Sequence, residues 1–299
     1  MPLHQRGVQA HDAGTQAPLV LAPGFQMQAL AWDAAGLSRQ VLPLLPGLKI
    51  EIVASCGSTN TLLLERAREG DAGPALLVAE QQTHGRGRQG RPWLSSAGAS
   101  LTFSLAMALL PKDWLGLSLA VGVALADALD PAGEHIGLKW PNDLWLKAGP
   151  PGQGRKLGGV LIETVASAGQ RVCVVGVGIN VLALAIPVLA TDFSTGYASL
   201  QEIDQQASAA KALLAVLAPL VQALQRFEGA GFAPFAPGFA RRDLLRGQPV
   251  STTLAALPHG VAEGVDEQGA LRVRAGSTMH TLSSGEVSVR PLAGAESTG

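Results

Sequence analysis

The sequence predicts an α+β fold, in which a mixed sheet with packed helices is followed by a small β-barrel. Between residues 49 and 227, strand-like runs alternate irregularly with apolar helical segments. From about Gly247 onward the pattern changes to short strand-like pieces separated by turns. Of the 299 residues, 47% are hydrophobic and 15% are charged, which is enough apolar material for one large domain or two ordinary ones.

The first four predicted elements are justified by their breaks and caps. A short helix over residues 29–42 ends before Pro43, and a strand follows over 49–54. The next helix covers 60–68, and Ser58 or Thr59 is a natural N-cap for it. Gly73 and Pro74 then mark a turn before a strand over 75–80.

The later elements depend more on proline and glycine. A strand is predicted over 101–108, and an apolar helix over 114–129 ends near Pro131. Pro141 within the strand-like run 137–146 implies an edge or a bulge, and the Gly/Pro-rich turn 147–155 makes a hairpin with the strand 156–163. Glycines in the strand 172–181 indicate close approach of the backbone to a ligand or a neighbouring element. A long Ala/Leu-rich helix spans 205–227.

The pattern divides the chain into four segments. Residues 1–47, broken by proline and glycine, form an extension packed on the main domain, which covers residues 48–242. A boundary is expected between 242 and 247, then a C-terminal domain over 247–292 and a tail over 293–299. The strands of that domain are predicted over 250–254, 260–265, 270–273, 279–282 and 286–289.

Composition excludes several classes of protein. A net charge of −1 argues against a general nucleic-acid binder. No apolar run is long enough to predict a membrane span, and residues 1–14 have no signal-peptide pattern. Cys56 and Cys173 are far apart and fit two small core residues in the cytoplasm, with a single disulfide as the alternative.

Residues 85–91, here called the glycine-arginine loop, combine three glycines with three arginines between two apolar runs. Glycines let the backbone approach a ligand, and arginines suit phosphate or carboxylate, so the loop predicts an anion site that closes over its ligand. Three other interpretations compete: a dinucleotide fingerprint, which requires a helix directly after Gly90, an RGG-like nucleic-acid segment, and a plain solvated basic loop.

Three motifs occur in order: GRGRQGR at 85–91 with Trp93, KWPNDL at 139–144, and KLGGVLIE at 156–163. With residues 58–60 and 176–181, this set resembles the bacterial biotin protein ligases, or biotin–[acetyl-CoA-carboxylase] ligases. The resemblance covers about residues 48–292. It implies the catalytic domain of the biotin/lipoate ligases, followed by an SH3-like barrel.

The resemblance implies a two-step reaction. Biotin and MgATP give biotinyl-5′-adenylate, and the acyl group then passes to a lysine of a biotin carboxyl carrier protein. Because biotin's carboxylate is already ionised at pH 7, the first step needs cations rather than a general base. The candidate cations are Arg86, Arg88, Arg91 and Lys156. Besides biotin, ATP and the carrier, no nucleic acid, membrane or protein-bound metal is expected.

The family's site residues map onto this sequence position by position. Lys156, Arg91 and Asp143 are the implied catalytic residues, with Asp143 as a base or orienting group in the second step. The implied biotin-binding positions are Ser58, Thr59, Asn60, Gln82, Arg86, Gly87, Arg88, Trp93, Lys156, Gly159 and Gly176. The implied nucleotide-binding positions are Arg88, Arg91, Asn142, Asn180, Tyr197, Glu286 and Arg290.

The sequence departs from the family in three places. Tyr197 stands where the family has a tryptophan thought to pack on adenine, and Ser251 stands where a lysine can occur. The segment before Lys49 holds few basic residues and is broken by proline and glycine, so we expect a ligase without an N-terminal DNA-binding domain. The alternatives are a lipoate–protein ligase, a biotin-responsive DNA-binding regulator and a nucleic-acid-binding module that uses the arginines.

Overall fold

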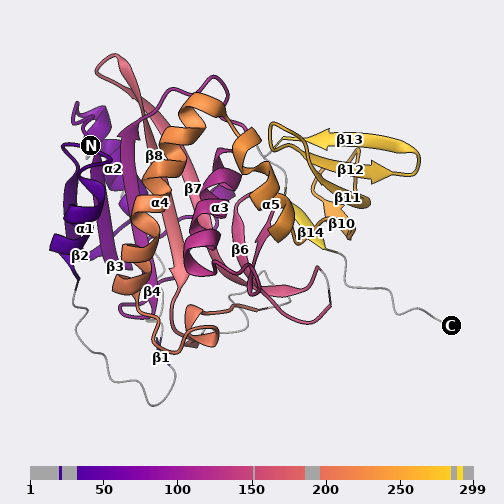
Figure 1. Cartoon of the computed structure of the whole chain (residues 1–299), viewed down its shortest axis with the longest axis horizontal. Helices are drawn as coiled ribbons and strands as arrows, with labels where there is room; N and C mark the ends of the chain where they lie inside the picture. The colour runs from indigo at the N-terminus through magenta and orange to yellow at the C-terminus, as the bar shows by residue number, and fades with distance from the viewer. Residues whose placement is uncertain (1–19, 22–31, 151, 186–195, 284–287, 292–299) are drawn as a thin grey trace, which may run out of the picture.

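The computed structural model describes residues 20–21, 32–150, 152–185, 196–283 and 288–291 (Figure 1). Its centre is a seven-stranded sheet in the order β2-β3-β4-β8-β7-β6-β5. Only β2 and β3 pair in parallel within it, and the other neighbours are antiparallel, so the predicted mixed sheet is confirmed. The strands are β2 (Lys49–Cys56), β3 (Ala75–Gln82), β4 (Ser100–Ala108), β5 (Ile136–Lys139), β6 (Asp143–Lys147), β7 (Gly154–Ser167) and β8 (Gln170–Asn180).

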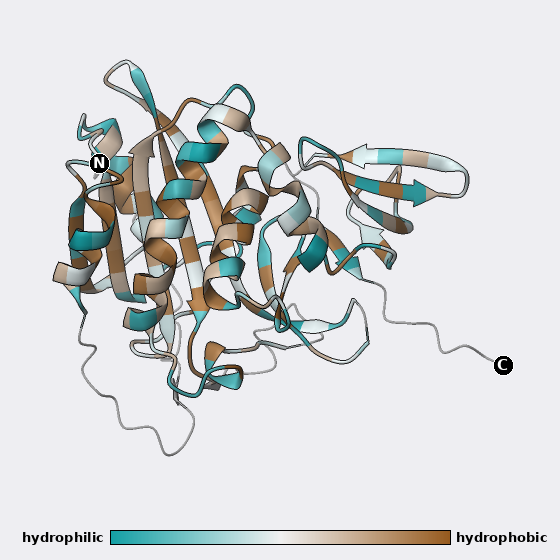
Figure 2. Cartoon of the chain, viewed as in Figure 1, coloured by the Kyte–Doolittle hydropathy of each residue, from teal (hydrophilic) through white to brown (hydrophobic). Residues whose placement is uncertain are grey.

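Helices cover both faces of this sheet (Figure 1). The first face holds α3 (Leu117–Leu129) and α4 (Ala209–Ala230), which pack on each other and on the strands, with α1 (Ala34–Val41) against α4. The opposite face holds α2 (Thr59–Arg68), which packs on β3, β4, β7 and β8. Buried hydrophobic residues form one large core and a smaller one under α2. Figure 2 colours much of the central strands and of the helices packed on them as hydrophobic.

Besides α1, which begins at Ala34 although the predicted helix 29–42 includes Trp32 and Asp33, two helices begin later than the sequence predicts. The predicted helix 114–129 starts only at Leu117. Gly116, directly before it, has a φ of 81°, in the left-handed region, so the right-handed helix cannot include that residue. The predicted helix 205–227 starts at Ala209, where the Ser208 side chain accepts a hydrogen bond from the Lys211 backbone N–H and caps the helix. In both places the prediction wrongly placed the start in residues that belong to the preceding loop.

The predicted strand 137–146 is also corrected. It is two antiparallel strands, β5 and β6, that turn through Pro141 and bring Lys139 opposite Asp143. Proline cannot donate to a strand ladder, so the break falls at that residue. The predicted hairpin with the next strand is confirmed, since β6 pairs antiparallel with β7 and has a register shift between Leu144 and Trp145.

The C-terminal strands form a separate antiparallel sheet at one end of the molecule, beyond α5 (Ala236–Arg242) (Figure 1). Their order is β13-β12-β11-β10-β14, as expected of a small SH3-like domain. The strands are β10 (Pro249–Thr252), β11 (His259–Val265), β12 (Leu271–Ala275), β13 (Thr278–Leu282) and β14 (Val289–Pro291). Trp140, fully buried after β5, donates from its indole nitrogen to the Gly269 carbonyl at 3.1 Å and ties this sheet to the larger one.

Three smaller features complete the fold. Strand β1 (Val20–Leu21) pairs antiparallel with β9 (Leu184–Ala185). Cys56 and Cys173 are both free; Cys173 lies in the core as predicted, whereas Cys56, at the end of β2, is only partly buried, so the prediction of a core residue is wrong there. Burial raises the pKa of the Cys173 thiol to about 12. Among the described helices, α4 alone is long and apolar enough to cross a membrane, but it lies in the protein core against α3, α1 and β4.

Candidate functional site

The glycine-arginine loop is a tight turn against the sheet. The Gly87 N–H donates to the Arg91 carbonyl at 2.7 Å, and the Trp93 N–H donates to the Gly85 carbonyl at 2.8 Å. A Cβ at Gly85 would lie 2.5 Å from the Trp93 carbonyl oxygen, so only glycine allows this closure. After Gly90 the chain is extended at Arg91, with φ −63° and ψ 138°, so the helix that a dinucleotide fingerprint requires does not follow.

One end of the pocket beneath the loop carries neutral polar side chains from the start of α2 and the end of β3, here called the polar end: Ser58, Thr59, Asn60 and Gln82. Ser58 caps α2, as its position predicts. Gln82 receives hydrogen bonds through its Oε1 from the Thr59 backbone N–H at 2.8 Å and the Thr59 hydroxyl at 3.1 Å. These bonds fix the orientation of the Gln82 amide at the end of β3.

Glycines in β7 and β8 make room for the site's larger side chains. A Cβ at Gly176 would lie 2.3 Å from Asn60 Oδ1, and a Cβ at Gly178 would lie 2.4 Å from the Trp93 ring. The close approach that the strand glycines predict is therefore one of neighbouring side chains to the backbone. Trp93 lies over Gly178, with its ring centroid 6.0 Å from Lys156 Nζ.

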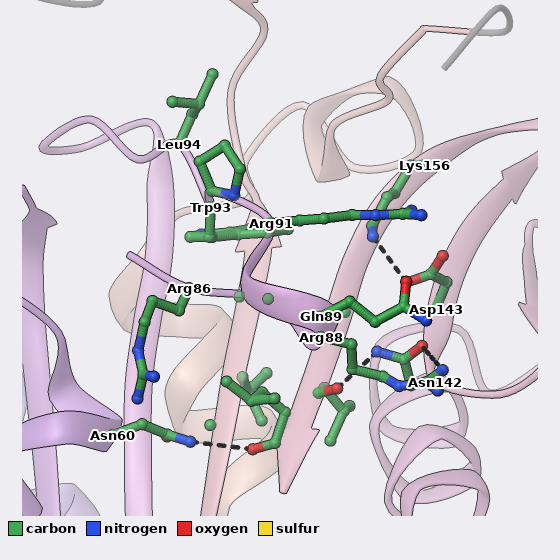
Figure 3. Close-up of a pocket in the computed structure, with 18 of the residues that line it drawn as sticks. Asn60, Arg86, Arg88, Gln89, Arg91, Trp93, Leu94, Asn142, Asp143 and Lys156 are labelled. Atoms are coloured by element: carbon green, nitrogen blue, oxygen red, sulfur yellow. Dashed lines mark hydrogen bonds and ion pairs between the residues drawn. The ribbon is translucent and has the colours of Figure 1, made fainter. Parts of the chain in front are cut away.

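The other end of the pocket, here called the cationic end, is built around one carboxylate. Lys156 Nζ, on β7, lies 2.7 Å from Asp143 Oδ1, and Lys139 Nζ lies 4.0 Å from Asp143 Oδ2. Arg91 extends toward this pair from the loop (Figure 3). The pocket is lined by a single acidic side chain, Asp143, among the described residues, and by six cationic ones: Arg86, Arg88, Arg91, Lys139, Lys156 and Arg290.

This excess of positive charge sets the ionisation of the buried groups. Burial alone would raise the pKa of Asp143, but the charges of Lys156 and Lys139 hold it below its usual value, so the group stays a carboxylate. Burial lowers the pKa of Lys139 to about 8, with Asp143 opposing the shift and Lys156, Arg290 and Arg91 adding to it. The site is therefore prepared for an anion that would balance its charge.

Two further segments complete the cationic end. The Arg91 guanidinium donates to the Ser288 hydroxyl at 3.4 Å, which in turn donates to Gln89 Oε1 at 3.1 Å, so the loop is attached to the C-terminal sheet. The backbone of Tyr197 pairs with that of Lys156 in an isolated parallel β-bridge. Asn180 joins β7 to the segment that follows Tyr197, since its Nδ2 donates to the carbonyls of Lys156 at 3.4 Å and Ala198 at 3.1 Å.

The structure brings the predicted site residues together around one pocket, with one exception. Glu286 lies outside the described residues. Arg88, whose pKa is lowered by burial, donates to Asn142 Oδ1 at 3.4 Å, and Asn142 donates to the Val160 carbonyl at 2.7 Å (Figure 3). The remaining predicted positions also line the pocket: Ser58, Thr59, Asn60, Gln82, Arg86, Gly87, Arg91, Trp93, Asp143, Lys156, Gly159, Gly176, Asn180, Tyr197 and Arg290.

Sequence reasoning missed two buried polar residues near the pocket. Lys139 lines it and is 7% exposed, although its motif was singled out without a role for the lysine. Its spacing of four from Asp143 across a proline was the available signal, because a hairpin there makes the two residues face each other. Ser104, fully buried in β4, donates to Thr59 Oγ1 and is 2.6 Å from Asn60 Oδ1. No local pattern separates it from an ordinary strand serine.

Comparison with known proteins identifies the family. The model of the Biotin/lipoate A/B protein ligase family matches residues 53–180, and that of the Biotin protein ligase C terminal domain matches residues 247–290. The bifunctional ligase/repressor BirA of Escherichia coli is 33% identical over 85% of this chain and 78% of its own length. This chain belongs to the biotin protein ligase family.

Other members of the biotin protein ligase family agree with this assignment. The biotin–[acetyl-CoA-carboxylase] ligase of Mycobacterium tuberculosis is 32% identical over 80% of this chain and 88% of its own. A solved structure of the Aquifex aeolicus biotin protein ligase in complex with biotin and ATP superposes with a TM-score of 0.67 at 29% identity. That match covers 82% of this chain and 99% of the other.

Proposed function

We propose that this chain activates biotin with ATP and transfers the biotinyl group to a lysine of a biotin carboxyl carrier protein. The observation that carries the proposal is that one pocket has neutral polar side chains, with Arg86 beside them, at one end and the Lys156–Asp143 pair with Arg91 at the other. Biotin has a neutral ring system and an ionised carboxylate, so it matches this division from end to end. The Aquifex aeolicus relative was solved with biotin and ATP, which supports the same assignment.

In the proposed first step, a biotin carboxylate oxygen attacks the α-phosphorus of ATP and pyrophosphate leaves. The two reactants repel each other because both are anions. Lys156 and Arg91, fixed near each other at the cationic end, reduce this repulsion and hold the reacting groups together. Lys139 adds charge from beneath Asp143. No group has to remove a proton in this step.

Mg²⁺ enters this scheme with ATP as part of the substrate. Among the described residues there is no group of three His, Cys, Asp or Glu side chains that could hold a metal ion. Asp143 is the carboxylate of the cationic end, and it is paired with Lys156. Magnesium commonly retains waters and is held mainly by phosphate oxygens with one or two carboxylates, so Asp143 is the lining residue that could contribute to holding MgATP.

In the proposed second step, the neutral amine of the carrier lysine attacks the adenylate carbonyl, the bond from this carbon to the phosphate oxygen breaks, AMP leaves, and the proton of the amine passes to water. Asp143 suits orientation better than proton removal, because the neighbouring lysines lower its pKa and make it a weak base. Its carboxylate sets the position of Lys156 Nζ at 2.7 Å. We therefore assign Asp143 the orienting role of the two that the sequence left open.

We further propose that the glycine-arginine loop closes over the adenylate. Its arginines at 86, 88 and 91 line the pocket, and its glycines permit the conformational change. Trypsin cleavage within residues 85–91 should slow when biotin and ATP are added together. Equal cleavage rates with and without the substrates would contradict closure.

The main test is ATP–pyrophosphate exchange with biotin and, separately, with lipoate. We expect exchange that depends on biotin, and lipoate-dependent exchange alone would favour the lipoate–protein ligase alternative. A gel shift with operator-like DNA tests the regulator alternative, and the net charge of −1 predicts no shift. Two free cysteines are consistent with the reducing cytoplasm, where we place the reaction.

A further inference from the structure

A row of residues across three strands supports the polar end from below. Ser104 on β4, Gly176 on β8 and Leu161 on β7 are cross-strand neighbours. Asn60 lies directly over Gly176, since a Cβ there would lie 2.3 Å from Asn60 Oδ1. The Asn60 amide is thus held between two strands, with the Ser104 hydroxyl 2.6 Å from its Oδ1 and its Nδ2 donating to the Leu161 carbonyl at 3.3 Å.

A charged group completes this arrangement. The Asn60 Nδ2 donates to Glu163 Oε2 at 2.9 Å, the shorter of the two bonds that it makes. Asn60 is 3% exposed, so its amide cannot exchange this acceptor for bulk water without rearrangement. A hydrogen bond to a carboxylate is stronger than one to a carbonyl, so Glu163 is the stronger determinant of where the Asn60 nitrogen points.

The same carboxylate also reaches the glycine-arginine loop. Arg86 Nη2 lies 3.4 Å from both Glu163 Oε1 and Oε2. Figure 3 shows the Arg86 side chain extending from the loop toward Asn60, away from the direction that Arg91 takes. The Glu163 side chain is 29% exposed and that of Arg86 is 43% exposed, so this pair is partly screened by water and weaker than the bond to Asn60.

We propose that Glu163 is a positioning residue that joins the polar end of the pocket to the glycine-arginine loop. One carboxylate sets the Asn60 amide for the biotin ring system and holds the loop through Arg86. This role rests on the proposed function, because it assigns biotin to the polar end. Glu163 itself does not line the pocket, so it acts through its two partners.

Two substitutions separate the two contacts. Glu163→Gln keeps an oxygen that accepts from Asn60 but removes the charge that attracts Arg86, whereas Glu163→Ala removes both contacts. We expect Glu163→Ala to raise the KM for biotin about five- to tenfold with kcat within about twofold of wild type, since the buried Asn60 Nδ2 loses its nearest acceptor altogether. Glu163→Gln should leave this KM within about twofold and speed trypsin cleavage in residues 85–91, without substrates, about two- to fivefold.

The matched control is the ion pair of Glu51 on β2 with Arg66, whose side chains have similar exposure and do not line the pocket. Glu51→Gln and Glu51→Ala should leave the KM for biotin and the loop cleavage unchanged. An unchanged KM in Glu163→Ala, or a KM in Glu163→Gln as high as in Glu163→Ala, would overturn the inference.

Two readouts keep the test decisive. If Glu163→Ala does not fold, the cleavage arm with Glu163→Gln decides, and a rate equal to that of wild type overturns the link to the loop. Wild-type exchange is measured first, because its absence rejects the proposed function as a whole. Active wild-type protein with unaffected Glu163 variants rejects only the role of Glu163.

Discussion

Two clusters of buried charge can be compared among the described residues, one in the pocket and one where the end of α5 meets the end of α3 and the start of β5. In the second cluster Arg242, 3% exposed, uses three nitrogens: Nε donates to Asp127 Oδ1 at 2.9 Å, Nη1 to Asp130 Oδ2 at 3.1 Å, and Nη2 to the Asp130 carbonyl at 2.6 Å. Burial alone would raise the pKa of Asp130, but backbone donors from Ile136 and His135 and the Arg242 side chain hold it lowered.

The pocket cluster is also buried, but in the part of the chain that the structure describes its cations outnumber its one carboxylate. Lys139 and Lys156 share one carboxylate, and Arg91 and Arg290 act on the same group of charges. Arg242 is neutralised by two carboxylates and saturated with hydrogen bonds, so it has nothing left to offer a ligand. A buried charge beside a cavity therefore indicates a binding site when opposite charges do not neutralise it. It indicates a structural role when it is neutralised and all its hydrogen bonds are made within the protein.

The largest expected effect comes from removing Arg242 from its cluster with Asp127 and Asp130. Arg242→Leu should destabilise the protein by about 3–5 kcal/mol, because it leaves Asp130 buried without its main charge partner. Urea unfolding measures this loss. Arg241→Leu, at an exposed position of the same helix, is the control and should change stability by less than about 0.5 kcal/mol. A loss below about 1 kcal/mol for Arg242→Leu would show that the cluster is not structural.

The next effect falls on the pocket cluster and on activity. Lys156→Ala should lower biotin-dependent ATP–pyrophosphate exchange by about 100- to 1,000-fold, the range found when one oriented charge-stabilising donor is removed. The unfolding midpoint should stay near that of wild type, because the pocket cluster contributes function rather than stability. Near-normal exchange in a folded variant would remove Lys156 from the catalytic role.

Asp243, directly after Arg242, is a largely buried acid that should make the stability depend on pH. Asp243 Oδ2 is buried and has no hydrogen-bond partner among the described residues, and burial raises the pKa of Asp243 to about 6. Because the unfolded pKa is about 3.9, the native state binds more protons between pH 4 and pH 6, and stability falls as the pH rises through this window. Asp243→Asn cannot ionise, so it should gain up to about 3 kcal/mol on wild type between pH 4 and pH 7.5, measured by urea unfolding at both pH values. A constant difference between the two proteins would contradict this interpretation.

The smallest expected effect concerns Lys139, one of the cations that outnumber the single carboxylate described in the pocket. Lys139 loses its charge as the pH rises through about 8, so the KM for ATP should rise about tenfold between pH 7 and pH 9, equivalent to about 1.4 kcal/mol. Lys139→Met should show the higher KM already at pH 7 and a flatter profile. Parallel profiles for the two proteins would mean that another group titrates.

Local sequence patterns predicted most of the fold but misplaced some element boundaries. Apolar runs and caps located the strands of the main sheet, and Ser58 was the expected cap of α2. The run 137–146 was predicted as one strand because its apolar residues continue on both sides of Pro141. Whether a proline marks a bulge or a turn depends on which strands pair with its neighbours, and pairing is a tertiary property.

By itself, the sequence determined the residue types of the site and their order along the chain. The motifs around Arg86, Asp143 and Lys156 resemble the biotin protein ligases, and they predicted a pocket for two anionic substrates. These motifs carry the signal because glycine, arginine and lysine at fixed spacing are constrained by local chemistry.

Only the tertiary structure decided which of these residues face each other. It placed Asn60 over Gly176, attached Arg91 to Ser288 from a separate sheet, and brought Glu163 within reach of both Asn60 and Arg86. Burial in the folded protein also set the pKa values of the pocket's charged groups. The pKa of Lys139, for example, falls because the surrounding side chains exclude water. No local pattern records that exclusion, because it arises from strands that are distant in the sequence.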